Sequence, residues 1–167
     1  MDLYILRHAI AVDRGTPGYE DDPSRPLTPD GIRKMRRAAK GIRALGPDFD
    51  GIWTSPWRRA AETADIVARA LEPEPSVQRC DALVSGVSPD LAIAELRKRT
   101  RKTRSVLIVG HEPQLSGIVS MMLAGHADLD VRLKKGGICK LECARLEPGA
   151  ASLIWLLTPG QLRRLSD

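Results

Sequence analysis

The stretch Leu3-Tyr4-Ile5-Leu6-Arg7-His8 decides how this chain is expected to fold. An apolar run rich in strand-forming residues ends abruptly on an arginine and a histidine, and small residues follow. In an open α/β sheet, ligands bind at the carboxyl ends of the strands. We therefore expect Arg7 to act as an anion clamp beside His8, which would be a nucleophile or a proton carrier. An ordinary surface Arg-His pair at the end of a first strand is the alternative interpretation.

The composition is typical of a soluble globular protein. With 167 residues, of which 43% are apolar, the chain is expected to form one domain over residues 1–167 and to bury a core without disulfides or metal. The three cysteines, Cys80, Cys139 and Cys143, are odd in number, which favours buried thiols in a reduced cytosol. No signal peptide or membrane-spanning run is recognisable, so we expect a cytoplasmic protein with no membrane partner.

Basic residues outnumber acidic ones. The chain has 26 Lys and Arg residues against 21 Asp and Glu residues, and the net charge of +5 favours an anionic partner. Two basic clusters, residues 33–43 and 97–104, fall where helices are expected, and solvated helix faces account for them. The three Trp, two Tyr and one Phe do not interleave with either cluster, so no nucleic-acid partner is expected.

Capping signals alternate with apolar runs along the chain. Thr28-Pro29 predicts a helix that buries a stripe including Met35, Ile42 and Leu45 and ends at Gly46-Pro47. Further helices are predicted after Ser55-Pro56 (to about residue 71), after Ser88-Pro89 into the second basic cluster, over 114–123 and after Thr158-Pro159. Strands are predicted over 3–6, 51–54, 106–109, 138–146 and 152–157. This order indicates an α/β fold, a three-layer αβα arrangement in which helices flank both faces of a mostly parallel sheet.

Three of the predicted strands end in charged or polar residues. The first ends in Arg7-His8, the second in Ser55 followed by Arg58-Arg59, and the third in Gly110-His111-Glu112. Parallel strands present their carboxyl ends at one edge, where the N-terminus of the helix near Pro56 adds backbone N–H groups. Guanidinium groups bind phosphoryl oxygens, and a neutral imidazole can attack phosphorus. The sequence therefore predicts a site for a dianionic phosphoryl group.

Sequence motifs surround these strand ends. They are Leu6-Arg7-His8-Ala9, Ser55-Pro56-Trp57-Arg58-Arg59-Ala60-Ala61-Glu62-Thr63-Ala64 and Val109-Gly110-His111-Glu112. In this order they resemble the three signatures of the histidine phosphatase superfamily, which implies a phosphoglycerate mutase-like fold. Arg25-Pro26-Leu27-Thr28 and Leu133-Lys134-Lys135-Gly136-Gly137 are similar to segments of the bacterial phosphohistidine phosphatases of the SixA type. The resemblance covers nearly the whole chain.

The resemblance implies a catalytic role for four residues. His8 is the residue that becomes phosphorylated, and Arg7 grips the phosphoryl oxygens. Arg59, four residues after the motif serine, is the second clamp, and His111 hydrogen-bonds the transferred phosphoryl group. No metal and no cofactor is expected, because clustered guanidinium groups repel a divalent cation.

Other residues are candidates for contacts with the substrate or for proton transfer. Ser55, Lys135 and the rim residue Arg58 are expected to contact the substrate. Glu112, next to the second histidine, and Asp81 are candidate proton donors, and each can instead be a solvated carboxylate.

The chain departs from the wider superfamily in two ways. Ala9 stands where glycine is commonest, and residues 81–89 are too short for the mutase-type segment that carries a proton-donating glutamate. An imidazole leaving from phosphohistidine has a pKa of about 6.5 and departs with little help from an acid, unlike an alkoxide. A pocket without a strong acid therefore favours phosphohistidine over sugar phosphates. His126 is expected to be a loop residue, and residues 9–27 are long for a connection, as functional loops are.

The leading hypothesis is a metal-independent protein phosphohistidine phosphatase. It would remove the phosphoryl group from a phosphorylated histidine of a partner protein, such as a phosphorelay domain, through a covalent intermediate on His8. Phosphate or sulfate is expected to bind the same pocket. The alternatives are a broad-specificity phosphomonoesterase for small molecules or nucleotides and a non-catalytic module that binds polyanions. A phosphatase assay with and without His8→Ala separates the enzymatic readings from the binding module.

Overall fold

The computed structural model describes residues 1–166, which form a six-stranded sheet with the strand order β3-β2-β4-β1-β5-β6. Strands β3, β2, β4 and β1 are parallel to one another, whereas β5 is antiparallel to β1 and to β6. The strand bounds are β1 (Asp2–Arg7), β2 (Gly51–Thr54), β3 (Val77–Arg79), β4 (Ser105–Gly110), β5 (Ile138–Cys143) and β6 (Ala151–Leu157). Only the short edge strand β3 has no counterpart among the predicted strands.

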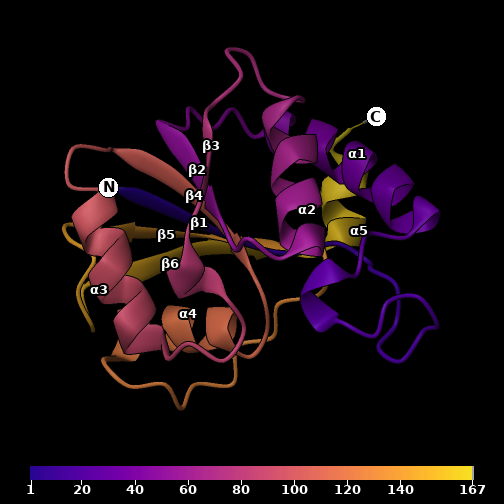
Figure 1. Cartoon of the computed structure of the whole chain (residues 1–167). Helices are drawn as coiled ribbons and strands as arrows, with labels where there is room; N and C mark the ends of the chain where they lie inside the picture. Colours follow the sequence, from indigo (N-terminus) through magenta and orange to yellow (C-terminus); the bar gives the residue numbers. More distant parts are fainter. Residues whose placement is uncertain (167) are drawn as a thin grey trace.

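Helices cover both faces of the sheet, which confirms the predicted three-layer α/β class. Helices α1, α2 and α5 lie on one face and α3 and α4 on the other (Figure 1). The helix bounds are α1 (Pro29–Ala44), α2 (Arg58–Ala68), α3 (Pro89–Arg99), α4 (Gln114–Ala124) and α5 (Pro159–Arg164). Two short 3-10 helices, η1 (Asp22–Ser24) and η2 (Asp81–Leu83), interrupt the loops before α1 and α3.

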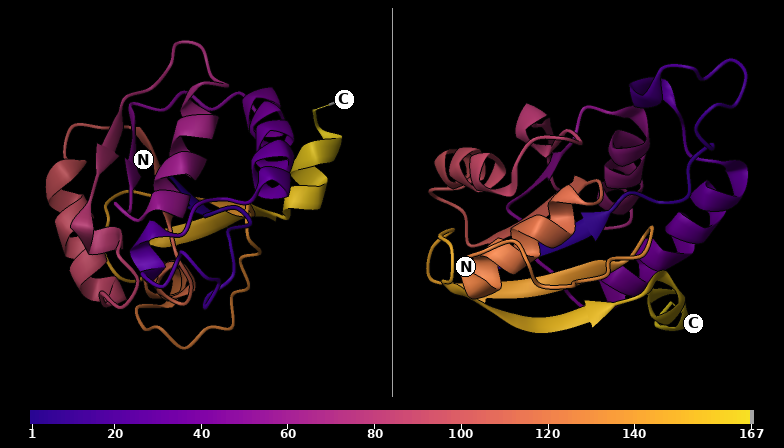
Figure 2. Two further views of the ribbon diagram at one scale, coloured as in Figure 1. Left: turned by 45° about the vertical axis from the view of Figure 1, so that its right-hand side comes forward. Right: turned by 90° about the horizontal axis from the view of Figure 1, so that it is seen from below.

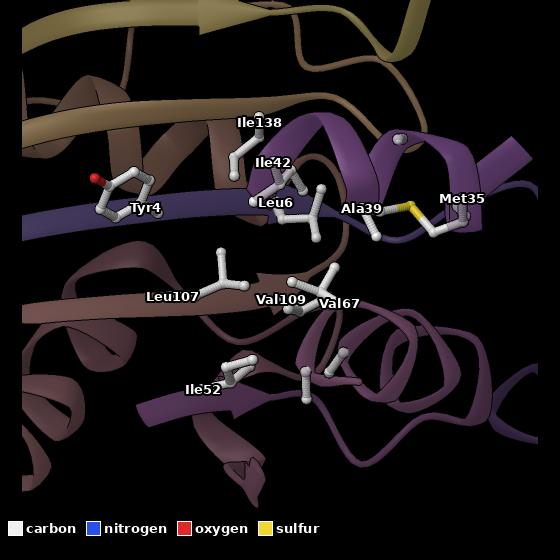
Figure 3. Packing of buried hydrophobic residues seen from close by; sticks show 14 of the residues in the cluster. Tyr4, Leu6, Met35, Ala39, Ile42, Ile52, Val67, Leu107, Val109 and Ile138 are labelled. Atoms are coloured by element: carbon white, nitrogen blue, oxygen red, sulfur yellow. The ribbon is translucent and has the colours of Figure 1, made fainter. Parts of the chain in front are cut away.

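The central strand β1 divides the core into two halves. Successive side chains of a strand point to opposite faces. Leu3 and Ile5 accordingly pack in the cluster under α3 and α4, while Tyr4 and Leu6 pack in the cluster under α1, α2 and α5. Figure 3 shows Leu6 within the second of these clusters, among side chains of neighbouring strands and helices. All four side chains are buried.

The first helix begins where its capping residue predicts. The Thr28 hydroxyl accepts a hydrogen bond from Gly31 N at 2.9 Å, and Pro29 is the first helical residue. The expected stripe is buried except for Leu45, which is 38% exposed because the helix has already ended at Ala44.

The contact between α1 and α5 depends on a glycine. The two helices lie side by side in both views of Figure 2. A Cβ atom on Gly41 would stand 1.9 Å from the Leu162 carbonyl oxygen, so only glycine permits this approach. Helix α5 itself begins with a capping box between Thr158 and Gln161, as the Thr-Pro signal predicts.

Helix α2 differs from its sequence-based prediction at both ends. Ser55 is not its N-cap: the Ser55 N–H bonds Val109 O at 2.9 Å and so extends the strand, and Trp57 takes the N-cap position. The helix also stops at Ala68, three residues before the predicted end. Similarly, α3 ends at Arg99, and the rest of the second basic cluster forms the turn that leads into β4.

The three cysteines are free and buried, as expected from the sequence. Burial raises the pKa of the Cys139 thiol to about 12, so this group stays protonated at physiological pH. Among residues 1–166, no helix is both long enough and apolar enough to cross a membrane.

Candidate active site

The three predicted strand ends meet at one edge of the sheet. Arg7 at the end of β1 is in register with Gly110 at the end of β4, and Thr54 of β2 is in register with Val109. Beyond the strands, His8 N donates to Gly110 O at 3.0 Å. Since β4 lies between β1 and β2, this arrangement brings the residues that follow all three strands together.

His8 is buried and held in one tautomer. Its Nδ1 atom lies 2.7 Å from Ala9 O, and a carbonyl oxygen can only accept, so Nδ1 carries the ring proton. The Nε2 atom is therefore unprotonated, and it accepts a hydrogen bond from Arg59 Nε at 3.3 Å. Burial, reinforced by the charges of Arg59 and Arg7, lowers the pKa of His8 from 6.5 to about 3, although the hydrogen bond to Ala9 O opposes the shift. At neutral pH His8 is thus a neutral imidazole with a lone pair on Nε2.

Arg59 connects His8 to the loop before α1. Its Nη1 and Nη2 atoms donate to the backbone oxygen and the carboxylate of Asp22, at 2.7 and 3.2 Å. The guanidinium carbon also lies 4.7 Å from the ring centroid of Trp57, within the range of a cation–π contact. Although burial lowers the pKa of Arg59, the Asp22 carboxylate opposes that shift, and an arginine stays charged.

His111 lies beside His8, with 5.1 Å between the ring centroids. Its Nε2 atom is 2.9 Å from the Ser55 hydroxyl, while its buried Nδ1 has no hydrogen-bond partner. The Ser55 hydroxyl accepts from Trp57 N at 3.3 Å, and because a hydroxyl both donates and accepts, it can also donate to His111 Nε2. Burial, reinforced by the charge of Arg59, lowers the pKa of His111 to about 3, so the imidazole is neutral at neutral pH. In the tautomer that accepts from Ser55, the ring proton is on Nδ1.

Arg7 is fixed by the loop before β5. Its Nη1 donates to Leu133 O at 2.8 Å, and Gly136 N in the same loop donates to Arg7 O at 3.0 Å. The buried Nε atom of Arg7 has no protein partner. Arg7, which lines the pocket, thus keeps one N–H donor that no residue among 1–166 occupies.

These residues surround a pocket of about 220 Å³. Five of the residues that line it are named by the sequence motifs, namely Arg7, His8, Arg59, His111 and Glu112, and Lys135 joins them at the rim. The remaining lining residues are Asp13, Arg14, Arg25 and Ser85. Sequence reasoning did not assign a role to these four, although Arg25 stands in the quoted Arg-Pro-Leu-Thr motif and the first three come from the long 9–27 loop.

Three candidate residues lie outside the pocket lining. Ser55 is fully buried behind His111 and supports that imidazole. The Arg58 side chain is 55% exposed and forms an ion pair with Glu62 at 2.8 Å. Asp81 is exposed on η2.

Of the two candidate proton donors, Glu112 is the one at the pocket. It lines the pocket, its Oε2 atom accepts from Ser116 N at 3.3 Å and from the Ser116 hydroxyl, and its buried Oε1 atom has no partner. His126, by contrast, is exposed and pairs with Asp128.

Thr63 connects the residue after His8 to the helix that carries Arg59. The fully buried Thr63 hydroxyl donates to Arg59 O at 2.6 Å and accepts from Ala9 N at 3.1 Å. The residue after His8 is therefore bonded directly to α2, one turn beyond Arg59.

The arrangement has the chemistry of an anion site rather than that of a metal site. No group of three or more His, Cys, Asp or Glu side chains within residues 1–166 is placed to hold a metal ion. Among residues 1–166, the buried pocket atoms without a hydrogen-bond partner include the nitrogens Arg7 Nε and His111 Nδ1 as well as the carboxylate oxygen Glu112 Oε1. An arginine N–H suits a phosphoryl oxygen.

Comparison with known proteins agrees with this geometry. Residues 3–84 match the family model described as the histidine phosphatase superfamily (branch 1). An uncharacterised protein of Picosynechococcus is 36% identical over 161 residues, which cover 95% of this chain and 96% of that protein. The phosphohistidine phosphatase SixA of Escherichia coli is 27% identical over 127 residues, covering 75% of this chain and 76% of SixA.

The fold also matches solved structures of this group. The structure of the protein histidine phosphatase SixA complexed with tungstate superimposes with a TM-score of 0.84 at 23% identity, covering 97% of this chain and 99% of that one. The family model, the strand-end motifs and the shared phosphoglycerate mutase-like fold agree with one another. This chain belongs to the histidine phosphatase superfamily, and is a phosphatase related to SixA.

Proposed function

We propose that this phosphatase removes the phosphoryl group from a phosphorylated histidine of a partner protein, through a covalent phosphohistidine intermediate on His8. The observation that carries the proposal is the orientation of His8, whose Nδ1–H is fixed on Ala9 O while the unprotonated Nε2 faces Arg59. A protein that only binds polyanions has no need of a nucleophile held between cations. The geometry therefore favours group transfer over simple binding.

The reaction proceeds in two displacements. In the first, Nε2 of His8 attacks phosphorus while the bond from phosphorus to the substrate imidazole breaks, and the departing nitrogen takes up a proton. Arg7 and Arg59 bind the phosphoryl oxygens, and His111 donates from Nδ1. In the second, water attacks phosphorus and the bond to His8 Nε2 breaks. The attacking water releases one proton, which balances the proton taken up in the first step, and inorganic phosphate leaves.

The leaving group supports phosphohistidine as the substrate class. An imidazole with a pKa of about 6.5 can depart with the help of water or of Glu112, whereas an alkoxide needs a strong, well-placed acid. Asp81 is exposed outside the pocket lining, and one of the two Glu112 oxygens, Oε2, already accepts hydrogen bonds from Ser116. The name of the Escherichia coli relative, phosphohistidine phosphatase, is consistent with this choice.

The surroundings of the pocket support a protein as the carrier of that histidine. The short segment 81–89 contributes only Ser85 to the pocket lining, so no insertion covers the entrance from that side. Phosphate or sulfate should bind in the same place, since tungstate, which one solved SixA structure contains, is a tetrahedral oxyanion like phosphate.

A comparison of substrates tests the proposal. The purified protein is assayed with a histidine-phosphorylated phosphotransfer domain, a nucleoside monophosphate and p-nitrophenyl phosphate, and kcat/KM is measured for each. We expect the phosphoprotein to be preferred by at least about a hundredfold, a difference of roughly 3 kcal/mol in transition-state binding. Equal or greater kcat/KM for the nucleotide would show a general phosphomonoesterase, and absence of turnover on all three would show a binding module.

A further inference from the structure

We propose that Asp22 is an internal counter-anion of the pocket, a positioning residue that orients Arg59 and weakens the affinity of the free site for phosphate. The proposal rests on the phosphatase function described above and deepens it, because it assigns the control of phosphate binding to a residue outside the three motifs.

Three arginines that line the pocket donate hydrogen bonds to the Asp22 carboxylate. Its Oδ1 atom accepts from Arg14 Nε at 3.2 Å and from Arg25 Nε at 2.6 Å, and its Oδ2 atom accepts from Arg59 Nη2 at 3.2 Å. The residue begins η1, within the 9–27 loop whose length predicts a function. One carboxylate is therefore shared by three cations that would otherwise repel one another across the pocket wall.

The contact with Arg59 determines which edge of its guanidinium faces the nucleophile. The two terminal nitrogens of Arg59 both donate to Asp22: Nη1 to the Asp22 backbone oxygen at 2.7 Å and Nη2 to the Asp22 carboxylate. The Nε–H, on the adjacent edge, then points at His8 Nε2, the atom that attacks phosphorus. A phosphoryl group arriving on Nε2 thus meets the edge formed by Nε and the second N–H of Nη2, a fork suited to two oxygens. Asp22 thus fixes the end of a guanidinium that otherwise contacts only the His8 and Trp57 rings among the interactions described above.

The Asp22 carboxylate also affects the affinity for anions. Burial raises the pKa of Asp22, but hydrogen bonds from Arg25 and Arg14 and the charge of Arg59 lower it to about 2, so the group is ionised at working pH. A negative charge bonded to Arg59 repels a phosphate bound by the same guanidinium. The free site therefore holds inorganic phosphate less tightly than its arginines alone would, which favours release of the product.

The test compares Asp22→Asn with Asp21→Asn. Both variants remove one negative charge from adjacent positions, but Asp21 is exposed and its side chain makes no ion pair within residues 1–166. The dissociation constant of inorganic phosphate is measured by calorimetry, and kcat and KM are measured with the phosphotransfer domain. For Asp22→Asn we expect phosphate to bind about tenfold more tightly while kcat falls about tenfold, as expected for loss of one charge-assisted contact. For Asp21→Asn, the phosphate dissociation constant and kcat should each stay within about twofold of the values of the unaltered protein.

A second variant separates orientation from charge. Asp22→Glu keeps the charge but displaces the carboxylate by one methylene group, so kcat should fall while the phosphate dissociation constant stays within about twofold. A merely structural role would weaken phosphate binding and turnover together in both Asp22 variants. Unchanged or weaker phosphate binding in folded Asp22→Asn, or unchanged kcat in Asp22→Glu, overturns the proposal. If Asp22→Asn does not fold, Asp22→Glu alone decides the orienting role.

The outcomes also distinguish this proposal from the proposed function. Phosphate binding is measured without any organic substrate, so it reports on Asp22 even if the phosphotransfer domain is not hydrolysed. Failure to hydrolyse that domain, together with tightened phosphate binding in Asp22→Asn, would reject the substrate class and retain the role of Asp22.

Discussion

The Nε atom of Arg59 donates to Nε2 of His8 across 3.3 Å, although 51 positions separate the two residues in the chain. The atom that we propose to attack phosphorus and one N–H of the proposed anion clamp are thus already in contact in the structure. A phosphoryl group attached to His8 Nε2 would take over this N–H, so the clamp has little distance to travel. Substitution of either residue should therefore affect turnover directly.

Replacing His8 by alanine should abolish turnover by several orders of magnitude, because the substitution removes the Nε2 lone pair that attacks phosphorus in the proposed mechanism. Rapid quenching of the unaltered enzyme during turnover should trap acid-labile phosphate on His8, detectable by mass spectrometry of a digest kept at alkaline pH. The control is His126→Ala, which removes an exposed histidine and should keep full activity. Substantial turnover in His8→Ala would contradict the covalent mechanism.

The neighbouring arginines 58 and 59 should respond very differently to the same substitution. Arg59→Lys should lose about a hundredfold or more in kcat/KM, because an ammonium group cannot reproduce a planar fork that contacts His8 and Asp22 together. Arg58→Lys keeps an exposed charge beside Glu62 and should stay within about twofold. The measurement is kcat/KM of the two variants in steady-state assays. A larger fall in kcat/KM for Arg58→Lys than for Arg59→Lys would show that Arg58, not Arg59, is the clamp.

The two pocket histidines should make the protein less stable as the pH falls below 7. Each has a folded-state pKa of about 3 against an ordinary 6.5. Between these values the unfolded chain binds protons that the folded chain does not, so the free energy of unfolding falls with pH. The expected loss between pH 7 and pH 5 is about 2 kcal/mol for each histidine.

Urea denaturation at pH 5, 6 and 7 measures this slope. His126→Gln, which alters an exposed imidazole, should leave the slope unchanged, whereas His111→Asn should reduce it by about half. A free energy of unfolding that does not change between pH 5 and pH 7 would show that neither buried histidine resists protonation.

Turnover should survive a strong chelator. The pocket already contains four arginines and a lysine, and these cations neutralise the phosphoryl charge that a divalent ion would otherwise balance. Activity after dialysis against EDTA should equal activity before it, and added Mg²⁺ or Zn²⁺ should not increase kcat. Loss of activity on dialysis and its recovery with one metal would contradict this expectation.

The packing of α1 against α5 should not tolerate a methyl group at position 41. Gly41→Ala places a Cβ atom 1.9 Å from a backbone oxygen, which cannot move as the end of a side chain can. We expect the free energy of unfolding to fall by about 1–3 kcal/mol, the range found for overpacked cores. Gly46→Ala is not a suitable control, because Gly46 has a positive φ. The control is Ala44→Gly, at the exposed end of the same helix.

Much of the fold could be predicted because its signals are local. Apolar runs mark β1 and β4, and Thr28 and Thr158 cap helices through contacts with residues three positions away. The motif histidines and arginines were found for the same reason, since each directly follows a strand or begins a helix.

The unpredicted features depend on contacts between distant residues. Ser55 resembles a helix cap in sequence, but its hydroxyl faces His111, 56 positions away. Asp22 gave no signal beyond its place in a long loop, because its partner Arg59 is 37 positions away and η1 has no periodic pattern. Local capping rules likewise placed the start of α2 two residues too early. The placement of Arg59 rather than Arg58 at the pocket was nevertheless predicted, from the resemblance of the motif and not from the capping signal.

The Thr63 hydroxyl, which bonds both Arg59 O and Ala9 N, has a consequence for motion. It joins the end of β1 to the first turns of α2, so the backbones that carry His8 and Arg59 are linked without the help of the loop between residues 9 and 27. The Arg59 guanidinium, by contrast, is bonded to Asp22 within that loop. A displacement of the loop would therefore turn the guanidinium on a fixed backbone and leave the position of the His8 imidazole unchanged.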